Sequence, residues 1–428
     1  MNDSHPGYAS HGSAEPPAQR LAGLRGPAPQ RSLDARALAA LAANPGCRRR
    51  ALLDAAGVDK TVLAERLGSP APFGRSPFAI ARGNVFEARV KADGYAELLL
   101  LLQRHLGLPE PDADGVAVPD LLPRAGTAVR AERTRQALAE AAARPGRWTL
   151  LDHPMLRLDV AGSPAHLEPD AVVVRPDGRW TVVEIKSFPI LDGSADPAKV
   201  GAAARQAAVY VLALREAAAE LAGVKPGDGP YDEPEGPAAA PDPTVLLVCP
   251  RDFSNRPTAA VVDVRRELAV TRRQLRRMTR IDRILDALPA DAGFDLSTAD
   301  DGTPARTDGQ LADAVAAVPA AYAPDCLSTC ELGFHCRREA RCADAVGQLG
   351  RSVRGELGSL RTVGGALAAA AGGVPGRGAR DGGGPAHDGG PADGGAGGPA
   401  DAVDEAAARL ARAAALRAEA LAEGGLRP

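Results

Sequence analysis

The sequence predicts an α/β fold, because helical and strand-like periodicities alternate along the middle of the chain. A helical segment precedes three strand-like stretches, an alanine-rich helical segment follows them, and a further strand comes next. The chain has 428 residues, of which 45% are hydrophobic, so it can form one large or two modest cores. Its net charge of −3 favours no class of partner.

The predicted elements follow from local sequence patterns. Helical patterns lie at 32–57, 83–107, 128–143 and 199–222, and an arginine-rich helix is expected at 265–288. Strand patterns lie at 147–160, 166–174, 179–188, 244–250 and 258–264.

Composition divides the chain into four parts. Residues 1–35 are predicted to be disordered, and 36–362 form one domain that a loop insertion at 225–243 interrupts. A glycine- and proline-rich linker follows at 363–402, and 403–428 form a short helix or tail. The N-terminus has no apolar signal region and no 18-residue apolar run occurs, so we expect a cytoplasmic protein without a membrane partner.

The strand at 179–188 carries two opposite charges on one face, Glu184 and Lys186. If 176–178 form a three-residue hairpin loop, positions that sum to 354 face each other, and Asp170 lies opposite Glu184. Two such carboxylates repel each other unless a divalent cation lies between them. Lys186 would then supply positive charge where a phosphate or an oxyanion lies.

Two alternatives to this metal site remain open. The hairpin could present a charged and solvated outer face, and a register change of one residue would separate the two carboxylates. Glu87 could add a third carboxylate from the earlier helix, although an exposed helical glutamate has the same pattern. Gln206 and Tyr210 lie four residues apart on one helical face, which is also typical of a core tyrosine.

Taken together, these residues resemble the RecB-like branch of the PD-(D/E)XK nucleases. The resemblance covers about 36–345 and rests on Gly83, Glu87, Asp170, Glu184-Ile185-Lys186, Gln206 and Tyr210. It implies a restriction-endonuclease-like core, in which a helix, a three-strand meander, a helix and a strand follow one another. It also implies a DNA nuclease, acting on ends or single strands, in DNA repair or antiphage defence.

The resemblance assigns a role to each residue. Glu87, Asp170, Glu184 and the Ile185 carbonyl would bind Mg²⁺ or Mn²⁺, although many relatives carry histidine in place of Glu87. Lys186 would position the attacking water and stabilise the transition state. The remaining two residues, Gln206 and Tyr210, would orient the site and the DNA.

Four cysteines gather near the end of the predicted domain, Cys326, Cys330, Cys336 and Cys342. In a reducing compartment such a cluster indicates a metal site. With the upstream Cys47, it resembles the iron–sulfur variant of the same family, found in AddB-type helicase-nucleases and CRISPR-associated RecB-like exonucleases.

That resemblance implies a [4Fe–4S] cluster that closes the helical N- and C-terminal parts of the domain. Its ligands would be Cys47, Cys326, Cys330 and Cys336. The first gap of the C-terminal trio is three residues rather than the usual two, so the four clustered cysteines alone could instead hold zinc or a cluster. His335 could serve as a further ligand.

The segment 265–288 contains eight arginines, some of which we expect to contact DNA phosphates without sequence specificity. A solvated arginine face is the alternative. The chain lacks the phosphate-binding motif of helicases, so unwinding would require a partner protein. Two other functions remain open: a catalytically silent iron–sulfur scaffold subunit, and a zinc- or redox-dependent DNA-binding regulator.

Overall fold

The computed structural model describes residues 15–71, 77–109, 115–160, 163–223, 241–278, 281–372 and 399–423. Contacts between residues divide the chain into two compact units. The first unit contains 1–63 and 72–319, and the second contains 64–71 and 320–428. One boundary, at 319–320, therefore falls inside the segment 36–362 that the sequence predicts as one domain.

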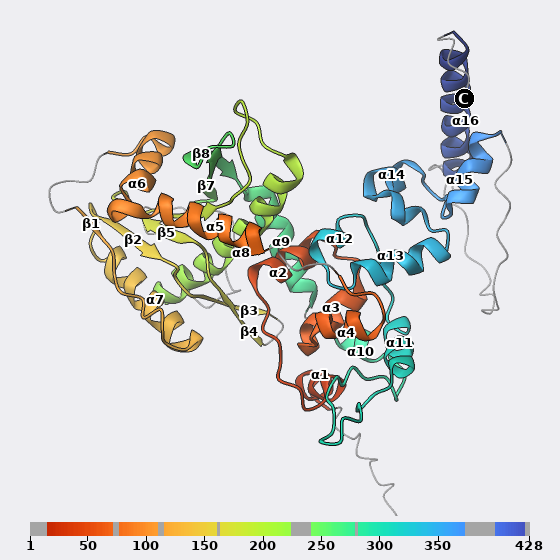
Figure 1. The fold of residues 1–428 in the computed structure, drawn as a ribbon, viewed down its shortest axis with the longest axis horizontal. Helices are drawn as coiled ribbons and strands as arrows, with labels where there is room; N and C mark the ends of the chain where they lie inside the picture. Colours follow the sequence, from red (N-terminus) through yellow and green to blue (C-terminus); the bar gives the residue numbers. More distant parts are fainter. Residues whose placement is uncertain are drawn as a thin grey trace, which may run out of the picture. The chain divides into compact units, whose positions relative to one another are not determined.

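The first unit is built on a mixed sheet, which confirms the predicted α/β class (Figure 1). In the described residues six strands lie in the order β1 (Val116–Ala117), β2 (Trp148–Asp152), β5 (Ala171–Val174), β6 (Trp180–Ile185), β7 (Thr244–Arg251) and β8 (Arg256–Asp263). The strands β2, β5 and β6 pair antiparallel, and β6 pairs parallel with β7. Helix α8 (Pro197–Leu221) makes the crossover between β6 and β7.

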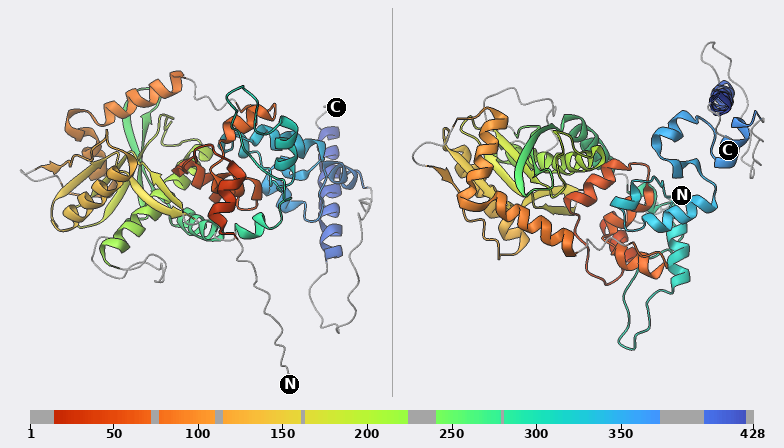
Figure 2. Two further views of the ribbon diagram at one scale, coloured as in Figure 1. Left: turned by 90° about the horizontal axis from the view of Figure 1, so that it is seen from below. Right: turned by 45° about the horizontal axis from the view of Figure 1, so that its top comes forward.

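Apolar side chains on both faces of this sheet are covered by helices (Figures 1 and 2). On one face, residues such as Val182 of β6 pack in a cluster with α2 (Ala35–Ala43), α7 (Thr127–Ala142), α8 and α9 (Arg265–Met278). On the other face, residues such as Val183 pack with α5 (Pro77–Val90) and α6 (Ala92–Leu106). Because a strand alternates its side chains between the two faces, Glu184 lies on the face covered by α8.

The hairpin between β5 and β6 has the predicted register. The paired positions include Ala171 with Val183 and Val174 with Trp180, so each pair sums to 354. The amide of Arg175 donates to the carbonyl of Arg179 at 2.8 Å and closes the loop at 176–178. These pairings and the three-residue loop confirm the register prediction.

Two of the predicted strands are each divided into two. The segment 147–160 forms β2 and β3 (Leu156–Val160), and the segment 166–174 lies partly in β4 (Ser163–Leu167) and partly in β5. Pro154 and Pro169 stand at the two breaks, where proline removes a backbone donor from the ladder. The strands β3 and β4 pair with each other in a separate two-stranded sheet.

Three of the predicted helices are also divided. The helix predicted at 83–107 forms the end of α5 and all of α6, and the chain kinks in the first turn of α6, where Asp93, Gly94 and Tyr95 have φ of 52°, 64° and 68°. The helix predicted at 32–57 forms α2 and α3 (Arg48–Ala56), with Pro45 and Gly46 between them. The arginine-rich segment forms α9 and α10 (Asp282–Leu285).

The N-terminal segment predicted to be disordered contains helix α1 (Pro17–Arg25). Contacts with distant residues hold it: the Leu24 carbonyl accepts a hydrogen bond from Phe294 N at 2.6 Å, and Arg25 Nη1 donates to the Ala56 carbonyl at 2.8 Å. Composition could not predict these contacts. The remaining part of the disorder prediction, 1–14, and most of the loop insertion predicted at 225–243 lie outside the described residues.

The described part of the second unit consists mainly of helices, and the first unit has further helices away from the sheet. The first unit also contains α11 (Asp308–Ala316), and α4 (Lys60–Arg66) spans the boundary at 63–64. The second unit contains α12 (Cys326–Thr329), α13 (Gly333–Cys342), a 3₁₀ helix (Val346–Leu349), α14 (Arg351–Glu356), α15 (Val363–Ala370) and α16 (Pro399–Glu423). Helix α16 lies where the sequence predicts a short C-terminal helix or tail, and it begins inside the predicted linker. Helix α15 occupies the start of the predicted linker, because its apolar residues pack in one cluster with α16.

Candidate functional site

The end of β6 and the residue before β5 bring the predicted carboxylates together. Asp170 Oδ2 accepts a hydrogen bond from the backbone amide of Ile185 at 2.6 Å, so the side chain of Asp170 is held against β6. Glu184 is only 1% exposed. The alternative of a solvated outer face is therefore wrong for this end of the hairpin.

Glu184 carries an incompletely satisfied carboxylate. Its Oε1 contacts Lys186 Nζ, whereas its Oε2 has no hydrogen-bond partner among the described residues. Burial raises the pKa of Glu184 to about 7, although the Lys186 ammonium lowers it. Burial also raises the pKa of Asp170. Burial thus disfavours the charged forms of both carboxylates. A hard cation bound between them would stabilise these charged forms.

The predicted pair on α8 reaches the same site. Gln206 Oε1 accepts a hydrogen bond from Lys186 Nζ at 3.3 Å, and Gln206 Nε2 donates to the Tyr210 hydroxyl at 2.9 Å. The hydroxyl donates in turn to the Glu168 carbonyl at 3.1 Å. Burial raises the pKa of Tyr210, so the hydroxyl stays protonated. This chain of hydrogen bonds anchors Lys186 to the backbone just before Asp170.

Glu87 projects from α5 into a second group of charges. Its Oε1 lies 2.6 Å from Lys91 Nζ and 3.0 Å from His153 Nε2. The hydrogen bond with His153, together with Lys91, lowers the pKa of Glu87 to about 2. The same hydrogen bond raises the pKa of His153. Glu87 is therefore ionised at neutral pH and is held by two neighbouring side chains.

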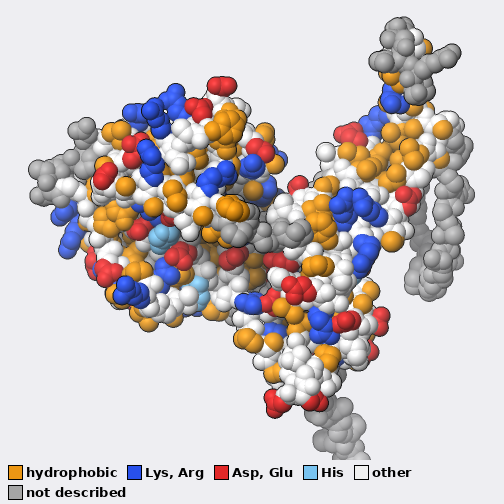
Figure 3. Space-filling view, viewed as in Figure 1, with side chains coloured by type: hydrophobic (Ala, Val, Ile, Leu, Met, Phe, Trp, Pro, Cys, Tyr) orange, Lys and Arg blue, Asp and Glu red, His pale blue; other side chains and the backbone are white. Residues whose placement is uncertain are grey.

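Three residues of this group are not predicted from the sequence: Lys91, Asp152 and His153. Asp152 ends β2 opposite Ala171, the first residue of β5, so it lies at the same edge of the sheet as Asp170. The signal in the sequence is the charged pair Asp-His directly after a buried strand. Figure 3 shows acidic, basic and histidine side chains together on the face between α5 and α7.

The clustered cysteines lie in the second unit, and Cys47 lies in the first. Cys330 and Cys336 are buried, Cys326 is half-buried and Cys342 is exposed. A Cβ atom on Gly333 would lie 2.5 Å from the Cys326 carbonyl oxygen, so only glycine lets the start of α13 approach α12 this closely.

Two of these cysteines, Cys326 and Cys336, lie near the side chain of Tyr322. Burial raises the pKa of Tyr322, and Cys326 and Cys336 add to the shift. The cysteine that ends α13, Cys342, is the exposed member of the cluster. His335 is buried, and its Nε2 lies 3.4 Å from Glu339 Oε1.

Three arginines in the described part of α9 are exposed: Arg265, Arg266 and Arg273. Arg265 also pairs with Asp263 at 2.8 Å. The apolar side of α9, which includes Leu268, packs in the hydrophobic cluster on one face of the sheet. Arg283 is exposed on α10. The side chains of Arg276, Arg277 and Arg280 lie outside the described residues.

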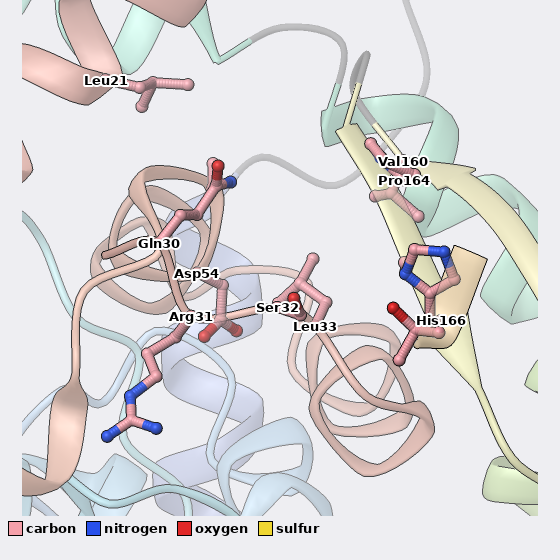
Figure 4. Close-up of a pocket in the computed structure, with 12 residues that line it drawn as sticks. Leu21, Gln30, Arg31, Ser32, Leu33, Asp54, Val160, Pro164 and His166 are labelled. Atoms are coloured by element: carbon pink, nitrogen blue, oxygen red, sulfur yellow. The ribbon is translucent and has the colours of Figure 1, made fainter. Parts of the chain in front are cut away.

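A pocket of about 310 Å³ opens elsewhere in the first unit (Figure 4). Gln30 and Arg31 lie on one side of it, and Pro164 and His166 of the β3–β4 hairpin lie on the other. Its buried carboxylate, Asp54, is already paired with Arg50 and Lys60. The charge of this carboxylate is therefore compensated within the protein by two cations.

As placed, no three His, Cys, Asp or Glu side chains of the described chain form a complete metal-binding group. At the sheet edge the ammonium groups of Lys91 and Lys186 lie against the carboxylates. The donor chemistry nevertheless fits Mg²⁺ or Mn²⁺, because these are oxygen ligands and the buried Glu184 Oε2 has no partner among the described residues.

Comparison with protein-family models and with curated proteins finds no match. None of the described helices is long and apolar enough to cross a membrane.

Proposed function

We propose that the protein is a metal-dependent deoxyribonuclease that hydrolyses phosphodiester bonds at DNA ends or in single strands. The observation that carries the proposal is the buried Glu184 carboxylate, which lies opposite Asp170 in the hairpin register and in contact with Lys186. The sheet order supports a restriction-endonuclease-like core of the RecB-like kind, since an antiparallel meander is followed by a crossover helix and a parallel strand.

The carboxylates of Asp170 and Glu184 and the carbonyl of Ile185 would hold the metal ion. Glu87 would add a carboxylate through Oε2, because Lys91 and His153 both contact its Oε1. A bound Mg²⁺ or Mn²⁺ would supply a Lewis acid for the phosphate and lower the pKa of a water molecule.

Lys186 would contribute positive charge where the phosphate becomes more negative, and would orient the attacking water. Its ammonium group is in place for this role because Gln206 accepts one of its hydrogen bonds and Tyr210 holds Gln206. Preorganised charge of this kind stabilises a transition state without reorganisation during the reaction.

DNA would be bound through its phosphates, as expected for a cytoplasmic nuclease without sequence preference. Arg266 and Arg273 on α9 are exposed and can contact phosphates. The 3% aromatic content leaves few residues for base stacking, which favours backbone recognition. A helicase partner would supply any unwinding.

The same proposal assigns a [4Fe–4S] cluster to Cys47, Cys326, Cys330 and Cys336. Two observations support this set over one that contains Cys342: Cys47 is buried, and Cys342 is exposed. Four thiolates are the usual ligands of such a cluster.

The test is cleavage of end-labelled single- and double-stranded DNA by anaerobically purified protein with Mn²⁺. We expect the wild type to cleave and Lys186→Ala to lose cleavage while it keeps its fold and its DNA binding. The matched control is Lys199→Ala, because Lys199 is a lysine on α8 whose side chain is 56% exposed.

Equal cleavage by wild type and Lys186→Ala would contradict the proposed role of the lysine. Absence of cleavage by folded, iron-containing wild type would instead support a scaffold subunit. A zinc-containing protein that binds but does not cleave DNA would support the regulator.

A further inference from the structure

Lys91 occupies a cation site that three elements build together. Its Nζ lies 2.6 Å from Glu87 Oε1 on α5 and 2.7 Å from Asp152 Oδ1 at the end of β2. It also lies 2.9 Å from His153 Nε2 and donates to the Asp170 carbonyl at 2.9 Å. The side chain is 10% exposed, so the ammonium group is largely removed from water. Carboxylates and carbonyls are also the ligands that hard divalent cations prefer.

The two sides of the site therefore differ in how their negative charge is compensated. On one side, Lys91 is shared between the carboxylates of Glu87 and Asp152. On the other, Glu184 contacts Lys186 with one oxygen only, and the buried Oε2 has no partner in the part of the chain that the structure describes. The negative charge that is still uncompensated therefore lies at Asp170 and Glu184.

We propose that Lys91 permanently fills the second cation position, so that the site takes one divalent ion rather than two. This inference rests on the proposed function, in which Asp170 and Glu184 bind the ion. Two-metal sites place their ions about 3.5–4 Å apart and share carboxylates between them. Here Glu87 and Asp152 hold an ammonium group instead, and Lys91 positions Glu87 for the single ion.

The test measures how many Mn²⁺ ions bind to the full-length, anaerobically purified protein. Calorimetric titration gives the stoichiometry, and electron paramagnetic resonance distinguishes an isolated ion from two spin-coupled ions. Binding that persists in Glu184→Gln is subtracted as binding outside the site. We expect one ion at the site of the wild type, with the signal of an isolated ion.

Two variants of Lys91 sharpen the measurement. Lys91→Met removes the ammonium group and should admit a second, spin-coupled ion between Glu87 and Asp152. Lys91→Arg keeps a positive charge there and should keep one ion. If Lys91→Met does not fold, Lys91→Gln replaces it, because it also removes the positive charge and should likewise admit a second ion.

Two coupled ions in the wild type would overturn the role of Lys91 and leave the proposed nuclease intact. One ion in a folded Lys91→Met variant would also overturn it. Absence of any Mn²⁺ bound through Glu184 would contradict the metal site itself, and the proposed function with it. The failure of the inference and the failure of the proposed function therefore give different results.

Discussion

Burial of individual acidic residues in the first unit disfavours their ionised forms. Glu216 lies on α8, half-buried, and burial together with the nearby Asp159 raises its pKa to about 7. The ordinary value is 4.5, so between pH 4.5 and 7 the folded protein retains a proton that the unfolded chain releases. Stability should therefore decrease as the pH rises through this window.

This shift predicts the behaviour of Glu216→Gln. The variant should lose part of the decrease in melting temperature between pH 5 and pH 8, because the amide has no charge to bury. At pH 8 it should melt higher than the wild type, and at pH 5 the two should melt alike. Thermal denaturation at the two pH values checks this, with Glu97→Gln, at an exposed glutamate on α6, as the matched control.

The hairpin of β5 and β6 is the element that fixes the site. Its loop places Gly178 at φ 82°, a conformation that costs a side-chain-bearing residue about 1–2 kcal/mol. The register that brings Asp170 opposite Glu184 depends on this loop having three residues.

Gly178→Ala should therefore lower the free energy of unfolding by about 1–2 kcal/mol. Gly201→Ala is the control of opposite sign. Gly201 lies inside α8, where alanine is favoured by about 0.5–1 kcal/mol and its Cβ would meet the Arg205 guanidinium at an ordinary 3.4 Å. Urea denaturation of both variants tests the pair, and equal destabilisation by both would contradict the argument.

Local patterns predicted this hairpin because the length of the loop sets the strand pairing over a few residues. The convergence of Asp170, Glu184 and Lys186 follows from the same short-range geometry. The division of the strands at Pro154 and Pro169 could have been read from the prolines, whose effect on strand pairing is local.

The cluster of Lys91, Asp152 and His153 could not be predicted in the same way. It depends on the packing of α5 against the end of β2, two elements that are far apart in the sequence. Only the pair of Glu87 and Lys91, four residues apart, is local. Helix α1 was missed for a related reason, since it is held by hydrogen bonds to Ala56 and Phe294 rather than by its own composition.

At the scale of the whole molecule, the iron content of the protein and of its cysteine variants tests the proposed cofactor. We expect anaerobically purified protein to contain about four iron atoms per chain and to be coloured. Cys47→Ser and Cys336→Ser should each lose iron and lower the melting temperature, because each removes a thiolate ligand. Elemental analysis of both variants checks the assignment.

Cys342→Ser is the matched control within the same segment, since this cysteine is exposed and lies outside the proposed ligand set. Iron loss in Cys342→Ser but not in Cys47→Ser would assign the cluster to the C-terminal cysteines alone. Stoichiometric zinc in a colourless preparation would reject the iron–sulfur assignment.

The central claim is that the buried carboxylate of Glu184 holds the catalytic metal ion. The most direct measurement is the single-turnover rate of DNA cleavage by Glu184→Gln at saturating Mn²⁺, because this change removes the charge and keeps the shape. We predict a rate lower by about 10³-fold or more, since the ion supplies several kcal/mol of transition-state stabilisation. A folded Glu184→Gln variant that cleaves as fast as the wild type would contradict the account.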